Sequence, residues 1–211
     1  MLSRLDEIVD AMRVTFDALD HAREQAYVLS RQVVRASSVA IKHAHRQEME
    51  QARVQLTEAR RLTHEMLGAV ADAPELRFGG FVHDSEKEYC EAAMVLAALN
   101  AEPLPTPEEL GVYPAAWLNG LAEVVGELRR HVLDLIRLDQ AASAEEYLGA
   151  MESIYQTILS FDYPNAISQG LRGRSDAARG LIERTRGDLT NALQATRLER
   201  SMKQLEAKLG R

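Results

Sequence analysis

Four glutamates, arranged as two pairs, are the residues whose type and spacing are best suited to chemistry. Glu88 and Glu91 are three residues apart, and Glu123 and Glu127 are four residues apart. In a helix, either spacing places both carboxylates on one face, where like charges repel mildly unless a cation lies between them. Carboxylates without a histidine at ligand spacing suit a hard cation such as Mg²⁺ or Mn²⁺. The pattern therefore favours a divalent metal site.

The surroundings of the two pairs differ. The first pair precedes the apolar run 92–99, AAMVLAAL, which is typical of a buried helix. Buried carboxylates are costly unless they are paired with a cation or bind a metal, so the metal interpretation leads slightly there. The second pair lies opposite an apolar seam of its own helix, so a solvent-exposed pair near Arg130 is an equally good interpretation. That alternative stays open for the second pair.

The composition is that of an all-α protein. The 211 residues are 46% hydrophobic and 27% charged, and only 5% are aromatic. Abundant Ala, Leu, Glu and Arg favour helices, and β-branched runs are scarce. The single cysteine, Cys90, excludes an intramolecular disulfide and fits a reducing, cytoplasmic location. Residues 1–12 form an amphipathic pattern without the apolar core of a signal peptide, and no run has the length of a membrane span. We expect one domain over residues 1–211.

Positive charge is concentrated in two segments, although the net charge is −7. Residues 21–46 hold five Lys or Arg and one acid, and residues 170–200 hold seven Arg and four acids. At about 100° per helical residue, four basic side chains of the first segment lie within about 60° of each other. We call them the basic stripe: Arg31, Arg35, Lys42 and Arg46. Taken alone, the stripe favours an ordinary solvated face, although the lack of interspersed acids weakens that interpretation. Two basic segments in an acidic chain suggest a selective anion site.

The apolar periodicity and the positions of Gly and Pro predict seven helices and no strand. Two long helices fill residues 2–67, with a break near 43–46, and a loop follows at 73–80. The third helix is expected to begin at Asp84 or Ser85 and to end near Leu99, before a proline-rich connection at 101–114. The others are expected at 115–138, at 143–160, at 164–170 and from a cap at Ser175 to Leu209. These elements predict an α-helical bundle.

Four segments, in the same order along the chain, resemble motifs of the translin/Trax family. They are LSRQVVRASSVAIKHAHR (29–46), EYCEA (88–92), WLNGLAEVVGELRR (117–130) and DYPNAISQGLRGRSDAARGLIERTRGDL (162–189). The similarity extends over nearly the whole chain. It implies a seven-helix translin-like bundle that assembles into a closed, hollow oligomer, typically an octamer.

The resemblance also implies a function. Translin-type subunits bind single-stranded RNA and DNA, and Trax-type subunits add a Mg²⁺-dependent endoribonuclease. The Trax catalytic acids and metal ligands correspond to Glu88, Glu91, Glu123 and Glu127. Position 123 departs from the aspartate of Trax, and Gly173 stands where microbial relatives often have a second arginine. The residues expected to bind nucleic acid are Arg31, Arg35, Lys42, Arg46, Arg130, Arg172 and Arg174.

We therefore expect a cytoplasmic homo-oligomer of about six to eight chains, acting on single-stranded RNA with no membrane partner. The apolar residues of the last helix that would support assembly are Leu193, Leu198, Met202, Leu205 and Leu209. One alternative is a translin-like scaffold that binds nucleic acid without cleaving it. A less favoured one is a ferritin-like metal protein, which needs Glu-x-x-His motifs; here Glu127 and His131 are four residues apart.

Overall fold

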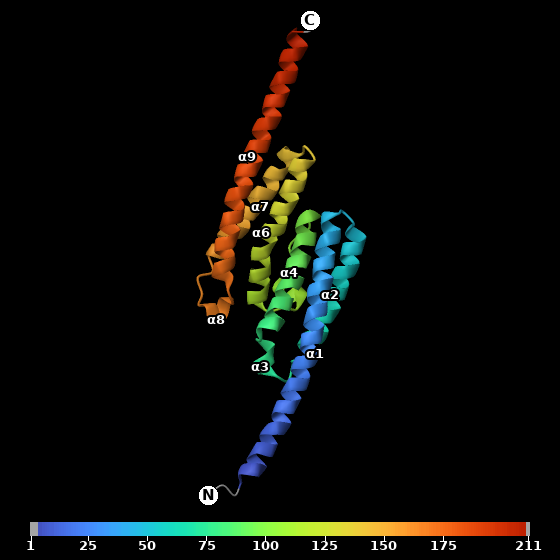
Figure 1. Cartoon of the computed structure of the whole chain (residues 1–211), viewed down its shortest axis with the longest axis vertical. Helices are drawn as coiled ribbons and strands as arrows, with labels where there is room; N and C mark the ends of the chain where they lie inside the picture. The colour runs from blue at the N-terminus through green and yellow to red at the C-terminus, as the bar shows by residue number, and fades with distance from the viewer. Residues whose placement is uncertain (1–3, 210–211) are drawn as a thin grey trace. The chain divides into compact units, whose positions relative to one another are not determined.

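The computed structural model describes residues 4–209, which contain nine helices and no strand (Figure 1). The helices are α1 (Leu5–His45), α2 (Met49–Ala69), α3 (Pro74–Arg77), α4 (Gly80–Leu99), α5 (Pro107–Leu110), α6 (Pro114–Arg137), α7 (Ala141–Leu159), α8 (Asn165–Ser168) and α9 (Leu171–Leu209). All seven expected helices are present, and α3 and α5 are additional single turns. The predicted all-α class is confirmed. No helix among these residues is both long enough and apolar enough to cross a membrane.

The chain forms two compact units, one ending at Trp117 and the other beginning at Leu118. The boundary falls within the first turns of α6, so most of that helix belongs to the second unit. Each unit is described separately below. The prediction of a single domain over residues 1–211 stays a prediction.

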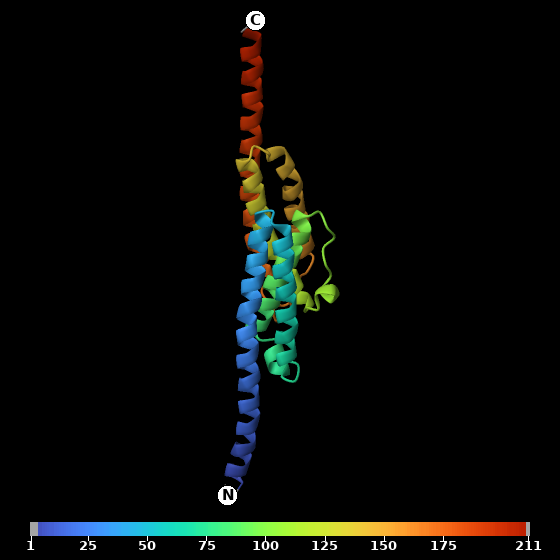
Figure 2. The same cartoon turned by 90° about the vertical axis from the view of Figure 1, so that its right-hand side faces the viewer.

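In the first unit, α1, α2 and α4 pack side by side (Figures 1 and 2). Their contact is built on small and branched apolar side chains, among them Ala26, Met66, Val70 and Val82, which are fully buried. Small residues allow the helices to approach closely, and the burial of apolar surface stabilises the unit. The first turns of α1 extend beyond α2 and α4 in both views. The core therefore lies among all three helices, with α4 packed against both α1 and α2.

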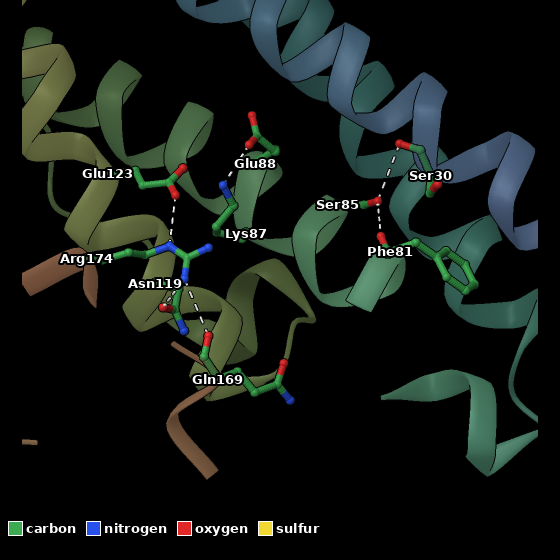
Figure 3. Close-up of polar contacts among 9 residues, drawn as sticks. All are labelled: Ser30, Phe81, Ser85, Lys87, Glu88, Asn119, Glu123, Gln169 and Arg174. Atoms are coloured by element: carbon green, nitrogen blue, oxygen red, sulfur yellow. Dashed lines mark hydrogen bonds and ion pairs between the residues drawn. The ribbon is translucent and has the colours of Figure 1, made fainter. Parts of the chain in front are cut away.

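Helix α4 begins at Gly80, four residues before the start expected at Asp84 or Ser85, so that part of the prediction is wrong. The extended Gly79 supplies the turn, and its carbonyl accepts the backbone N–H of Val82 at 3.0 Å. The Ser85 hydroxyl instead donates to the carbonyl four residues earlier, at 2.6 Å (Figure 3). A capping serine would bind free N–H groups. Here the burial of Val82 extends the helix past the polar residues.

In the second unit, α6 packs against α7 and α9 through a cluster that includes Ala122, Ile158 and Leu171. Helix α9 begins at Leu171, so the expected cap at Ser175 is also wrong, and Ser175 is buried inside the helix. The turn before α9 is formed by Gly170, whose φ is +92°, and its N–H donates to the Asn165 side chain at 2.7 Å. Glycine reaches this φ without steric cost. The turn, rather than a serine cap, fixes the start of α9.

Candidate functional site

The first pair of acids lies on α4, within the first unit. Glu91 is only 8% exposed, and Glu88 is half-buried. The ammonium group of Lys87, itself buried, donates to Glu88 Oε1 at 2.7 Å (Figure 3). A buried carboxylate needs such a counter-charge or a metal. Lys87 was not among the residues predicted from the sequence, where its only sign of a role is its position directly before Glu88.

The neighbouring Glu86 holds α4 in place. Its side chain is 1% exposed and accepts two hydrogen bonds from the Arg77 guanidinium, both at 2.9 Å. The backbone N–H of Tyr113 donates to the same carboxylate at 3.2 Å. Burial raises the pKa of Glu86 above its usual value, although the Arg77 charge and the Tyr113 N–H both act to lower it. Glu86 thus ties α3 and the segment before α6 to the helix that carries the first acid pair.

The second pair of acids lies on α6, within the second unit, and both side chains are half-buried. Glu123 Oε1 accepts a hydrogen bond from Nε of Arg174 at 2.9 Å (Figure 3). Glu127 Oε2 lies 3.8 Å from Nη1 of Arg130. The side chains of Glu123 and Glu127 are 30% and 25% exposed. Both acids are thus partly exposed, and Glu127 lies beside Arg130, as the alternative left open by the sequence expects.

Arg174 contacts three residues of the second unit, two on α6 and one directly after α8. Its Nη1 donates to Oδ1 of Asn119 at 3.1 Å and to the backbone carbonyl of Gln169 at 3.4 Å (Figure 3). Asn119 is fully buried, and its Nδ2 donates to the Ser168 carbonyl at 2.8 Å. Glu123 and Asn119 are four residues apart on α6, so one guanidinium bridges them. The sequence analysis missed Asn119, whose only signal is an amide within the apolar side of the helix.

The basic stripe is exposed, as its spacing predicts. Arg31, Arg35, Lys42 and Arg46 are all solvent-exposed on α1 or directly after it. The opposite side of α1 is buried at Val33, Ala36, Ala40 and Ala44. The helix therefore packs on one side and presents a row of cations on the other.

The three remaining arginines predicted to bind nucleic acid lie in the second unit. Arg172 is exposed, Arg130 is half-exposed, and Arg174 is half-buried in the network described above. Arg129, which the sequence analysis did not select, is the less exposed neighbour of Arg130 on α6. Its guanidinium donates to the Thr185 hydroxyl and to Asp188, each at 2.9 Å. Adjacent arginines thus have different surroundings, which their spacing alone does not reveal.

Each acid pair lies on a single helix, the first on α4 and the second on α6. The first pair and the basic stripe belong to the first unit, and the second pair with Arg130, Arg172 and Arg174 belongs to the second. A metal site shared by the two pairs stays a prediction. Cys90 is buried, and burial raises the pKa of its thiol far above the usual value. A protonated, inaccessible thiol does not act as a nucleophile or as a metal ligand.

Comparison with known proteins places this arrangement in a family. No family model matches the chain. An uncharacterised protein of Methanocaldococcus jannaschii is 30% identical over 189 residues, which are 89% of this chain and 83% of that protein. The sequence of AfC3PO, a translin-family protein of known crystal structure, is 35% identical to this chain. The two structures match with a TM-score of 0.81 over 89% of this chain and 97% of that chain. This chain belongs to the translin family.

Two further structures extend the comparison. AfC3PO in complex with duplex RNA matches this translin-family chain at 34% identity, with the same TM-score of 0.81 and the same coverage. The structure of apo-NeC3PO has a TM-score of 0.79 and covers 91% of this chain and 98% of that one. At 20% identity, this last match shows a shared fold alone. The resemblance predicted from the four motifs is confirmed.

Proposed function

We propose that this chain is an RNA-binding protein that cleaves single-stranded RNA with a divalent metal. The observation that carries the binding proposal is the exposed basic stripe on a helix whose opposite side is packed. A row of cations along several helical turns suits a phosphate backbone and reads no sequence. The similarity to AfC3PO, which has a structure in complex with duplex RNA, supports RNA as the ligand. Single-stranded DNA is a second ligand of the same chemistry.

The cleavage proposal assigns the metal to Glu88, Glu91, Glu123 and Glu127, as the family resemblance implies. Carboxylate oxygens on two helices fit Mg²⁺ or Mn²⁺, which prefer oxygen ligands. Such an ion, when bound, neutralises charge on the phosphate and lowers the pKa of a water molecule. The chain's own acids hold the ion and orient that water. Arg130 and Arg172 contribute contacts to the phosphate backbone.

A second candidate function is a translin-family scaffold that binds RNA without cleaving it. The observation that favours it is the pairing of acids with cations, Lys87 with Glu88 and Arg174 with Glu123. Ion pairs of this kind satisfy buried carboxylates without any metal. The two functions share the basic stripe and differ only in the chemistry of the acids. A cleavage assay therefore separates them.

The proposed assembly is a closed homo-oligomer of about six to eight chains. The support within the chain is the far end of α9, where four apolar side chains remain more than half exposed. They are Leu198, Met202, Leu205 and Leu209, with exposed fractions of 63%, 55%, 57% and 77%. Exposed apolar rows of this kind mark interaction surfaces. Light scattering should give several times the chain mass of 23.5 kDa, and a monomer at micromolar concentration would contradict the proposal.

The deciding experiment compares Glu91→Gln with the unmodified protein and with Glu145→Gln, an exposed glutamate on α7. Labelled single-stranded and duplex RNA are incubated with Mg²⁺, Mn²⁺ or EDTA. Glu91→Gln removes the charge and keeps the size, so it should abolish metal-dependent cleavage while RNA binding and assembly persist. Near-normal cleavage by Glu91→Gln would exclude a catalytic role for that acid. RNA binding without cleavage by the unmodified protein, with either metal, would establish the scaffold.

A further inference from the structure

The guanidinium of Arg174 is bonded within the protein, whereas an arginine that binds phosphate is usually exposed to solvent. The Arg174 guanidinium donates to Glu123 at 2.9 Å, to Asn119 at 3.1 Å and to the carbonyl of Gln169 at 3.4 Å. The side chain is 26% exposed. Arg172, two residues earlier on the same helix, is exposed. The two arginines of the GLRGRSD segment therefore lie in different environments.

We propose that Arg174 is a positioning residue for the Glu123 carboxylate rather than a nucleic-acid contact. Its Nε donates to one carboxylate oxygen, Oε1, and so restricts the orientation of the carboxylate. This role deepens the proposed function and rests on it, since it assumes that Glu123 is a metal ligand. It differs from the phosphate contact predicted for Arg174 from the sequence.

The length of the glutamate side chain gives the physical reason. Glutamate has one more rotatable bond than the aspartate that the Trax motif has at this position, and each ordered rotor costs conformational entropy. An ion pair at the end of the side chain restricts these rotors before a metal arrives. Catalytic geometry is sensitive to such restraint, because a misplacement of about 1 Å can cost about a hundredfold in rate. Arg174 thus compensates for the longer arm of Glu123.

The turn between α8 and α9 also helps to position Arg174. Gln169 and Gly170 have φ values of +48° and +92°, which direct the Gln169 carbonyl and the start of α9. A Cβ added at Gly170 would lie 2.9 Å from Nη1 of Arg174. A Cβ at Gly173, by contrast, meets nothing within 4 Å. The positive φ therefore favours glycine at 170, and the absence of a Cβ there leaves room for the guanidinium.

The first experiment separates positioning from phosphate contact, with Arg172→Ala as the matched control. Arg174→Ala should lower kcat by about tenfold to a hundredfold, with KM and RNA affinity unchanged. The slope of log Kd against log salt for single-stranded RNA should also be unchanged. Arg172→Ala, as the loss of a phosphate contact, should reduce that slope by about one unit and weaken RNA affinity. A reduced slope for Arg174→Ala with normal kcat would overturn the inference.

The second experiment moves Arg174 without removing its charge. Gly170→Ala should lower kcat in the same direction as Arg174→Ala, because the added methyl displaces the guanidinium and also strains the turn that carries the Gln169 carbonyl. Gly173→Ala, in an open position on the same helix, should leave kcat within about twofold. Full activity of Gly170→Ala in a folded protein would show that the position of Arg174 does not matter. This variant also keeps the inference testable if Arg174→Ala fails to fold.

The third experiment asks whether Arg174 acts through Glu123. Glu123→Asp withdraws the carboxylate by one methylene, so the Arg174 contact is lost while a metal ligand remains. In that background, Arg174→Ala should lower kcat by less than about twofold. The same test can be made on stability in EDTA, where no metal is needed. The shift in urea midpoint of the double variant should be smaller than the sum of the shifts of the two single variants. Additive effects in both measurements would overturn the inference. Absence of metal-dependent cleavage by the unmodified protein would instead refute the proposed function.

Discussion

The ion pair between Arg77 and Glu86 allows a prediction whose size follows from the structure. Arg77→Ala removes two hydrogen bonds of 2.9 Å from a carboxylate that is 1% exposed. The Tyr113 N–H, at 3.2 Å, is the other donor described for it. Breaking one partner of a buried pair typically costs about 3–5 kcal/mol. Arg77 is 25% exposed, so the lower end of that range applies.

Protonation sets an upper limit to the cost. An unpaired buried carboxylate takes up a proton. Protonation at a pH above the unfolded pKa costs about 1.4 kcal/mol for each pH unit of difference. With an unfolded pKa of 4.5, this limit is about 3.4 kcal/mol at pH 7 and about 0.7 kcal/mol at pH 5. A raised pKa in the folded state stabilises the fold below the unfolded pKa, and that contribution is lost as the pH rises. The destabilisation by Arg77→Ala should therefore be about 3 kcal/mol at pH 7 and no more than about 0.7 kcal/mol at pH 5.

Urea denaturation in EDTA at both pH values measures this difference. Adding Glu86→Gln to Arg77→Ala should recover much of the loss at pH 7 and remove the pH dependence, because the amide cannot ionise. Arg53→Ala breaks an exposed ion pair with Glu102 and serves as the control, with almost no expected change. A loss of equal size at pH 5 and pH 7, unaffected by Glu86→Gln, would refute the reasoning. The cause would then be lost packing of the Arg77 side chain.

Three further predictions concern other side chains of the two units. Arg129→Ala should lower the free energy of unfolding by about 2 kcal/mol in urea titrations, whereas Arg130→Ala should change it little; equal losses would contradict the contacts of Arg129 with Thr185 and Asp188. Arg31→Ala combined with Lys42→Ala should flatten the salt dependence of RNA binding by about one unit of slope per lost contact, and an unchanged slope would make the stripe an ordinary solvated face. Cys90 should resist a thiol reagent in the native protein and react in denaturant, and rapid native labelling would show that it is accessible.

Local pattern was sufficient for the fold class and for both acid pairs. A helix repeats about every 3.6 residues, so spacing alone places Glu88 with Glu91 and the basic stripe on single faces. The buried side of α1 and the exposed cations follow from the same periodicity. Motif order predicted the translin family, which the comparisons confirm. These properties depend on neighbours within a few turns, which the sequence displays directly.

Helix starts were the weakest local prediction. Asp84 or Ser85 and Ser175 have the composition of caps, yet α4 and α9 each begin four residues earlier. A cap contributes about 1 kcal/mol, and burial of one apolar side chain contributes more. Gly79 and the turn at Gly170 therefore decide the boundaries, together with the apolar residues that follow them.

Only the tertiary structure decided what each charge contacts. Glu123 and Arg174 are 51 residues apart in sequence, and Arg129 is 59 residues from Asp188. No periodic signal connects such positions, because the contact exists only after α6 and α9 have packed. Sequence alone could therefore nominate Arg174 as a cation for a phosphate, but folding places its guanidinium on a carboxylate. The energy of a charge depends on its partners and its burial, and both are properties of the folded chain.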